Sequence, residues 1–165
     1  MKKLLVCLVL VLGLFSLTAC NNDTEPKEED KPTTVAGILA SEFKTLAKEE
    51  KDMSVVASKL SENENIKIKV MAEELTEESY IFGFDDEIKD FKSGYIIAPM
   101  ISTQPFVAYI FEVENPEEFL ANLKDKANLR WNICVEAEEM VTSRKDNIVF
   151  FVMSPLNFLY VISIF

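Results

Sequence analysis

The spacing of apolar residues after residue 34 is helical. Four apolar side chains, three and four positions apart, fall on one face of a helix: Val35, Leu39, Phe43 and Leu46. Thr34 has the short polar side chain preferred at a helix N-cap, and the apolar period fades near Lys51. The pattern therefore predicts a helix that begins at Val35 and ends near Lys51, followed by a shorter helix over residues 54–60.

Three later segments have the patterns of β-strands. Residues 66–70 alternate strictly between aliphatic residues and lysine, which predicts a half-buried strand at the edge of a sheet. Residues 95–101 and 106–113 are near-continuous apolar runs, which indicates two strands buried on both faces for part of their length. Because the connection between them is short, we expect these two strands to pair as a hairpin. Pro99 within the first run indicates an edge position or a bulge there.

A third helix and further strands complete the predicted order. Asn115 at the N-cap, Pro116 at the first helical position and acids in the first turn predict a helix start. The buried stripe of this helix is predicted to comprise Phe119, Leu120, Leu123, Ala127 and Trp131. Short apolar runs at 133–135 and 140–142 precede residues 148–153, which have the strongest strand pattern of the chain. The order predicts an α+β fold, with an antiparallel or mixed sheet of about four to five strands and helices packed on one face.

The first twenty residues have a different pattern. Two lysines precede an apolar run over residues 4–17, and small residues lead directly into a cysteine. A positive start, an apolar core and a small-residue cleavage site are typical of an export signal. The cleavage site is similar to the bacterial lipobox, and its residues are Leu17, Thr18, Ala19 and Cys20. In a lipobox the cysteine sulfur receives a diacylglyceryl group and the chain is cut before it. Residues 1–19 are therefore predicted to be a lipoprotein signal peptide; the alternative is an ordinary secretory signal with a chance cysteine.

Residues 20–34 are predicted to be a tether that begins with the lipidated Cys20. After the cysteine, this segment contains two prolines, five acids and two lysines, but no aliphatic or aromatic residue that it could bury. A flexible chain of this length reaches roughly 20 Å, and charge repulsion extends it. Residues 35–155 are long enough for a single domain with a core of its own.

The end of the chain is an apolar tail over residues 156–165. No charged residue occurs from residue 147 to the end, and this length would suit a membrane span. However, Pro155 and Asn157 divide the segment, and its first half is predicted to be a core strand. We therefore expect the tail to pack on the domain or to lie on the bilayer. A frameshifted or read-through end is a further explanation for it.

The protein is strongly acidic, with a net charge of −11. The predicted signal peptide carries two lysines and no acid, so the remaining chain has a net charge of −13. Such a surface is repelled by phosphate backbones and by anionic lipids, so we expect neither a nucleic-acid partner nor electrostatic docking to a membrane. Membrane attachment is expected through acyl chains on Cys20, at about 0.8 kcal/mol per buried CH₂.

The cysteine and histidine content limits the chemistry. Cys7 leaves with the signal peptide and Cys20 is predicted to be acylated, so no disulfide can form within the mature domain. Cys134 lies in an apolar stretch, which favours a buried, inert thiol over a nucleophile. The chain contains no histidine, which excludes Ser-His-Asp and Cys-His constellations and His-ligated zinc. The sequence therefore nominates no catalytic residue, no cofactor and no metal ligand.

Residues 80–91 contain two features that binding sites also use. Three of their apolar side chains have the spacing of a core-facing stripe around a predicted helical turn: Phe84, Ile88 and Phe91. The alternative for the aromatic residues is a sugar-stacking surface of Tyr80, Phe82 and Phe84. Four acids could attract Ca²⁺, namely Asp85, Asp86, Glu87 and Asp90. Because they lack the spacing of a calcium loop, we favour a solvated helix N-terminus.

Three segments of the domain carry a resemblance to a known family. These segments are residues 98–101, 129–134 and 149–155, together with the lipobox. Over residues 35–155 the chain resembles small lipoproteins of Gram-positive bacteria of the domain-of-unknown-function type, such as the family catalogued as domain of unknown function 4358. The resemblance implies an exported, lipid-anchored α+β domain and supplies no activity or catalytic residues. The apolar tail departs from the polar or helical ending of that family.

Together these features predict a lipoprotein held at the extracytoplasmic face of the cell membrane, with a non-enzymatic accessory or binding domain. One alternative is a glycan-cleaving hydrolase with a carboxylate pair, which needs no histidine. The acids are too abundant for the sequence to nominate that pair. Another alternative is an interaction partner of a second envelope protein, which predicts an exposed apolar patch.

Overall fold

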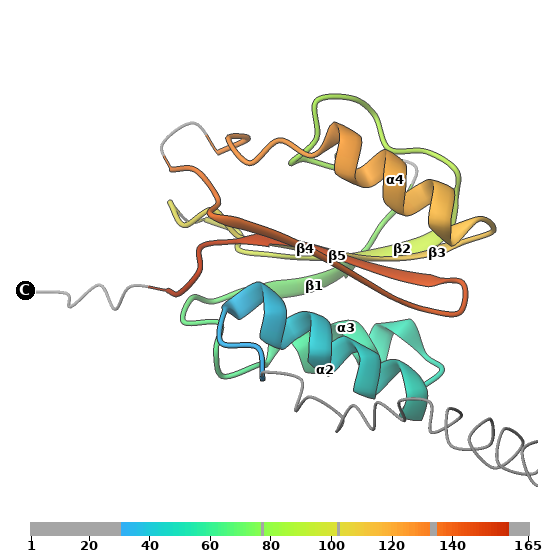
Figure 1. The fold of residues 1–165 in the computed structure, drawn as a ribbon, viewed down its shortest axis with the longest axis horizontal. Helices are drawn as coiled ribbons and strands as arrows, with labels where there is room; N and C mark the ends of the chain where they lie inside the picture. The colour runs from blue at the N-terminus through green and yellow to red at the C-terminus, as the bar shows by residue number, and fades with distance from the viewer. Residues whose placement is uncertain (1–30, 77, 102, 133–134, 159–165) are drawn as a thin grey trace, which may run out of the picture. The chain divides into compact units, whose positions relative to one another are not determined.

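The computed structural model describes residues 31–76, 78–101, 103–132 and 135–158, and their architecture is a β-sheet with helices packed against it (Figure 1). The elements follow the order α2 (Val35–Glu49), α3 (Met53–Ser61), β1 (Met71–Glu74), β2 (Phe91–Ala98), β3 (Val107–Val113), α4 (Pro116–Lys126), β4 (Glu139–Lys145) and β5 (Ile148–Ser154). Five strands pair antiparallel in the order β1-β2-β3-β5-β4. The predicted α+β fold and the predicted antiparallel sheet are confirmed.

Helices cover both faces of the sheet, so the prediction of helices on one face is wrong. Helices α2 and α3 lie against one face and α4 lies against the other (Figure 1). The reason is the burial of the central strands. Along β3, Ala108 and Ile110 belong to the core under α2 and α3, whereas Tyr109 and Phe111 belong to the core under α4. A sheet that is apolar on both sides has to be covered on both sides.

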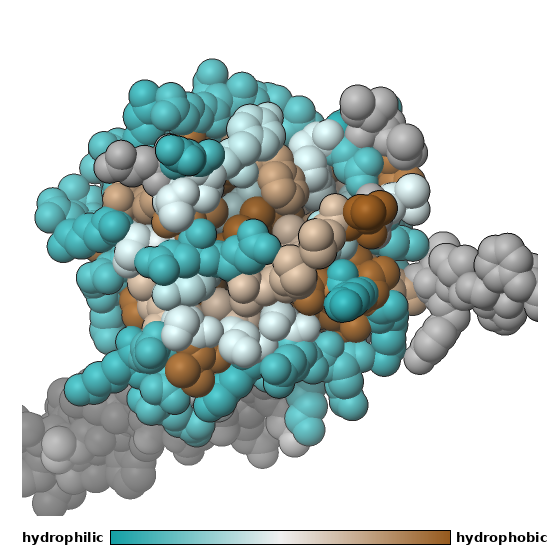
Figure 2. All heavy atoms as spheres, turned by 180° about the vertical axis from the view of Figure 1, so that it is seen from behind, coloured by the Kyte–Doolittle hydropathy of each residue, from teal (hydrophilic) through white to brown (hydrophobic). Residues whose placement is uncertain are grey.

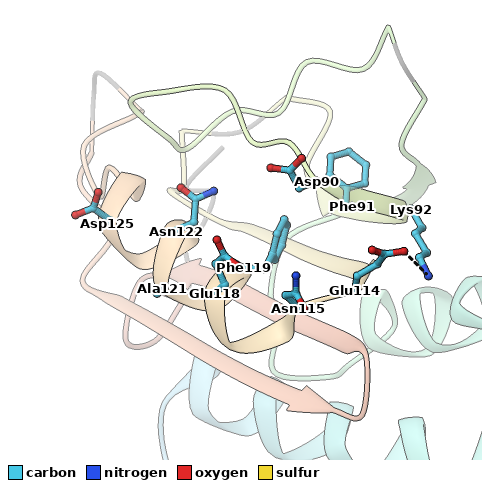
Figure 3. A pocket seen from close by; sticks show the side chains of 10 residues that line it. All are labelled: Asp90, Phe91, Lys92, Glu114, Asn115, Glu118, Phe119, Ala121, Asn122 and Asp125. Atoms are coloured by element: carbon cyan, nitrogen blue, oxygen red, sulfur yellow. Dashed lines mark ion pairs between the residues drawn. The ribbon is translucent and has the colours of Figure 1, made fainter.

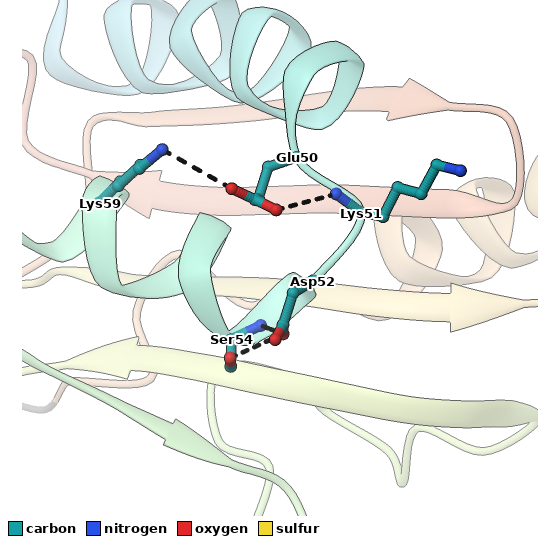
Figure 4. A network of polar contacts seen from close by, with 5 residues as sticks. All are labelled: Glu50, Lys51, Asp52, Ser54 and Lys59. Atoms are coloured by element: carbon teal, nitrogen blue, oxygen red, sulfur yellow. Dashed lines mark hydrogen bonds and ion pairs between the residues drawn. The ribbon is translucent and has the colours of Figure 1, made fainter.

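The first two helices begin and end close to where the pattern predicts. The Thr34 hydroxyl accepts a hydrogen bond from the Gly37 backbone N–H at 3.2 Å, which caps α2. The Asp52 carboxylate caps α3 by accepting bonds from the Ser54 backbone N–H at 2.9 Å and the Ser54 hydroxyl at 2.6 Å (Figure 4). These bonds hold the pKa of Asp52 below its usual value.

The third helix also begins as predicted, at Pro116 after Asn115. The Asn115 side chain makes no capping hydrogen bond, so proline at the first position and the acids of the first turn favour this start. Phe119 and Leu123 are buried under the helix. The helix ends at Lys126, so the last two members of the predicted stripe, Ala127 and Trp131, lie beyond it and are only partly buried.

The predicted hairpin of β2 and β3 is confirmed, but the strand expected at residues 66–70 is not formed there. The strand forms instead at β1, where Met71 pairs with Ala98. In this register Val70 would face Pro99, which has no backbone N–H to donate, so the ladder cannot extend in that direction. Pro99 therefore terminates β2, and the edge position or bulge predicted within that strand is wrong.

Two smaller predictions also fail. Residues 85–90 contain bends and irregular chain in place of a helical turn, and hydrogen bonds that Asp85 and Glu87 form with Lys126 at the end of α4 hold them there. Val135 lies in a bend and is half exposed, so it does not belong to a strand; its predicted strand partners 133–134 lie outside the described residues. The strands predicted at 140–142 and 148–153 are confirmed as β4 and β5.

The first residues of the apolar tail pack on the domain. The Phe158 side chain is buried beside Phe106, with 5.8 Å between the ring centroids. The Leu156 carbonyl oxygen accepts a hydrogen bond from the Val35 backbone N–H at 3.1 Å, which joins the tail to the start of α2. Residues 159–165 lie outside the described residues, as do the predicted signal peptide and residues 20–30 of the tether.

Two buried serines make a matched test of the polar groups of this core. The Ser143 hydroxyl is buried with no hydrogen-bond partner among the described residues, whereas the Ser154 hydroxyl donates to the Pro155 carbonyl oxygen at 2.8 Å. We expect Ser143→Ala to leave the free energy of unfolding unchanged or to raise it by up to about 1 kcal/mol, and Ser154→Ala to lower it by about 1 kcal/mol. Urea unfolding followed by tryptophan fluorescence measures both. A loss of stability for Ser143→Ala as large as for Ser154→Ala would contradict the assignment of an unpaired hydroxyl.

Candidate functional site

A groove lies between α4 and the residues that lead into β2 (Figure 3). Its volume is about 920 Å³. One wall consists of Asp90, Phe91 and Lys92, and the opposite wall consists of residues of α4 and of the turn before it. The residues on that second wall are Glu114, Asn115, Glu118, Phe119, Ala121, Asn122 and Asp125.

The groove combines an acidic rim with an aromatic floor. Four carboxylates and one lysine line it, and the Lys92 ammonium forms an ion pair with the Glu114 carboxylate at 3.4 Å. The rings of Phe91 and Phe119 each lie 5.1 Å, centroid to centroid, from the ring of Phe111 in the sheet. The floor is therefore anchored to the core, while the excess of negative charge at the rim favours a cationic ligand.

Hydrogen bonds to the end of α4 fix the segment that carries the first wall. The Asp85 backbone N–H donates to the Lys126 carbonyl oxygen at 2.8 Å, and the Asn128 backbone N–H donates to the Gly83 carbonyl oxygen at 2.9 Å. Two side-chain bonds support them: Asn128 Nδ2 donates to Asp85 Oδ1 at 2.7 Å, and Lys126 Nζ donates to the Glu87 carbonyl oxygen at 2.9 Å. The two walls are thus connected at one end of the groove.

Two residues of this segment have a positive φ. Gly83 has φ +93°, a conformation that L side chains rarely adopt, so the backbone favours glycine there; a Cβ at this position would also lie 2.6 Å from the flexible end of the Met153 side chain, Cε. Asp90 has φ 68°, a left-handed conformation that aspartate tolerates better than most residues. The turn at Asp90 leads the chain into β2 at the rim of the groove, where Figure 3 shows the Asp90 carboxylate above α4.

The aromatic residues before the groove are mainly core residues, as predicted. The Phe84 ring lies 4.9 Å from the ring of Phe151, and the Phe82 ring lies 6.3 Å from the ring of Tyr109. Only Tyr80 is fully open to solvent, with 81% of its surface exposed. The three side chains considered as a sugar-stacking surface therefore do not form one. The core assignment of Phe84, Ile88 and Phe91 is confirmed, although no helix presents them.

No group of three acidic or thiol side chains within the described ranges lies close enough together to hold a metal ion. The acids at residues 85–87 and 90 therefore do not assemble into a calcium site. The helices α2, α3 and α4 of the described chain are all too short or too polar to cross a membrane.

The site residues named from the sequence lie elsewhere. The lipobox, Leu17, Thr18, Ala19 and Cys20, lies outside the described residues, and so does Cys134. Sequence reasoning did not find the groove, because its acids come from elements that are separated along the chain. The only signal in the sequence was the general excess of acids, which does not distinguish these positions from the others.

The chain matches no protein-family model, no curated protein and no solved structure. The resemblance to small Gram-positive lipoproteins therefore stays a prediction.

Tyr109 provides a test of the core between the sheet and α4. Its side chain is fully buried, its hydroxyl donates to the Phe82 carbonyl oxygen at 2.8 Å, and burial raises the pKa of the phenol. Because a tyrosine in the unfolded chain ionises near pH 10, folding stability should fall as the pH rises above about 10. We expect Tyr109→Phe to cost about 1–2 kcal/mol at neutral pH and to reduce the alkaline loss.

Tyr80→Phe is the matched control, because this tyrosine is exposed and makes no buried hydrogen bond. Urea unfolding at pH 7 and at pH 10.5 compares the three proteins. An alkaline loss of the same size in Tyr109→Phe as in the unsubstituted protein would contradict the role of the buried phenol.

Proposed function

We propose that this protein is a lipid-anchored lipoprotein of the extracytoplasmic membrane face, with a domain that binds a ligand or a partner and carries no catalytic activity. The observation that supports it most is the lipobox, Leu17-Thr18-Ala19-Cys20, after a positive and then apolar start. The acidic tether that follows is a suitable spacer between acyl chains and a folded domain. The resemblance to small Gram-positive lipoproteins leads to the same proposal.

The folded domain supports a binding role. Its groove has an anchored aromatic floor and a rim of carboxylates, which together suit a ligand with both an apolar part and a positive charge. The chain lacks histidine, so the commonest general base and the common nucleophile-activating pairs are excluded. The net negative charge is unfavourable for a nucleic acid.

The anchor is tested by labelling growing cells with radioactive palmitate. We expect the full chain to incorporate label and to sediment with membranes, and we expect Cys20→Ala to do neither, because the acylated sulfur is absent. Cys134→Ser is the matched control, since it removes the other cysteine of the mature chain and should keep the label. Equal labelling of the unsubstituted chain and Cys20→Ala would refute the anchor.

The groove is tested by the binding of a fluorescent oligolysine peptide with one tryptophan. We expect binding that weakens with salt, because exposed charges are screened. Replacing two rim acids, Glu118→Gln with Asp125→Asn, should weaken binding about fivefold. The pair Glu49→Gln with Glu62→Gln removes the same charge at exposed positions outside the groove and should have little effect. Equal weakening by both pairs would show that only net charge matters.

A carboxylate-dependent glycan hydrolase is the second candidate. The observation that favours it is the presence of acids on both walls, with Asp90 on one wall and Glu118 on the other. Glycosidases use two carboxyl groups separated by about 5–9.5 Å. Incubation with cell-wall glycan separates the candidates. If the unsubstituted protein releases soluble fragments and neither Asp90→Asn nor Glu118→Gln does, the protein is a hydrolase and the binding proposal is wrong.

A further inference from the structure

Exposed apolar side chains are concentrated at one end of the sheet. Apart from Tyr80, the large apolar residues exposed within the described ranges are Met100 at 77%, Ile101 at 96%, Val135 at 45% and Leu156 at 41%. A single exposed apolar side chain is common, but a group of them on one part of the surface marks a contact with a protein or a membrane. Figure 2 shows the face opposite to that of Figure 1, where dark brown side chains are most frequent toward the same end.

The strand registers place these four residues at one end of the sheet. Ala98 pairs with Met71, Val107 pairs with Met153, and Glu139 pairs with Ser154, so all five strands have one end in common. The four exposed residues follow or precede those strand ends in the chain. A bond of 3.5 Å from Asn132 Nδ2 to the Thr103 carbonyl oxygen also connects the loop before β4 with the loop between β2 and β3. Both loops lie at the left of Figure 1.

Both segments that flank the domain begin at this same end. The hydrogen bond of 3.1 Å from the Val35 backbone N–H to the Leu156 carbonyl oxygen puts the start of α2, and hence the end of the tether, beside the exposed Leu156. The seven residues after Phe158 read Leu-Tyr-Val-Ile-Ser-Ile-Phe and are uncharged. An acyl anchor on Cys20 would therefore hold this end of the domain closest to the bilayer.

The two ends of the sheet lie far enough apart for this attachment to favour one of them. The seven residues of β5, at about 3.3 Å each, separate the ends by roughly 20 Å. The composition of the predicted tether, residues 21–34, predicts a reach of about the same size. Contact of the opposite end with the bilayer would therefore require the tether at its full extension.

The charged groups at this end do not prevent contact with lipid. The Arg130 guanidinium pairs with the Glu136 carboxylate at 3.7 Å, and the Glu138 carboxylate accepts a hydrogen bond from the Leu156 backbone N–H at 2.9 Å. The large negative charge of the whole chain opposes an orientation in which a broad face of the domain lies against anionic lipids. An end-on approach through apolar side chains keeps most of that charge away from the surface.

We infer that the end of the sheet formed by Met100, Ile101, Val135 and Leu156 inserts into the interface of the bilayer to which the protein is anchored. The inference rests on the proposed anchor at Cys20 and adds an orientation to it. The apolar side chains reach the boundary between headgroups and acyl chains, as the apolar faces of monotopic proteins do. The groove beside α4 extends from the opposite end of the sheet and stays open to solution.

The test uses the full chain, acylated in cells and transferred to vesicles of phosphatidylcholine and phosphatidylglycerol. A polarity-sensitive fluorophore is attached at Ile101→Cys or, as the matched control, at Lys51→Cys in the exposed connection after α2, both in a Cys134→Ser background. Flotation of the vesicles measures the anchor, and quenching by lipids with a nitroxide on the acyl chain measures the contact. We expect both proteins to float and the fluorophore at position 101 to be quenched several-fold more strongly.

The outcomes separate the two proposals. Floating proteins with equal quenching at positions 101 and 51 would overturn the insertion while the anchor stands, and the apolar end would then be assigned to a protein partner. Proteins that do not float would overturn both proposals.

Trp131 gives a second measurement without labels, because it is the only tryptophan and lies in the loop before β4. Its quenching by the same lipids should fall severalfold in Met100→Ser with Ile101→Ser, which changes two exposed side chains. Unchanged quenching would again count against insertion.

Discussion

The pairing of β3 with β5 is the interaction on which the rest of the domain depends. Tyr109 lies opposite Phe151 on one face of the sheet, and Ile110 lies opposite Phe150 on the other. The same pair of strands therefore supplies both hydrophobic cores. The Phe43 ring of α2 stacks on the Phe150 ring at 5.2 Å, which fixes one helical layer to this pair. Burial of apolar surface on both sides is the main favourable term for such a sheet.

The other face is covered differently, and this difference creates the groove. Helix α4 has 11 residues and is the one helix of the described chain on this face, so it covers only part of the five-stranded sheet. The long connection between β1 and β2 covers the rest of the face. The Phe84 ring of that connection packs on the Phe151 ring at 4.9 Å. Where the connection turns into β2, it and α4 diverge, and their acidic residues form the rim of the groove.

The two ends of the sheet have contrasting surfaces. At one end the loops carry exposed apolar residues, and there the start of α2 at Val35 is hydrogen-bonded to Leu156. At the other end β4 and β5 are connected by a tight polar turn at Asp146 and Asn147, where Asp146 has φ 54°. This contrast suits the proposed anchored domain, in which the apolar end would contact lipid and the groove would face water.

The sequence by itself determined the elements with complete local signals: α2 with its cap at Thr34, α4 with proline at its first turn, and the apolar strands β2, β3 and β5. It also predicts a signal peptide and a tether, from the order and composition of their residues. Only the tertiary structure decided where β1 forms, since Pro99 of the partner strand stops its ladder. It likewise decided that helices cover both faces and that a groove forms beside α4. Those features arise from contacts between residues far apart in the chain, for which local spacing carries no signal.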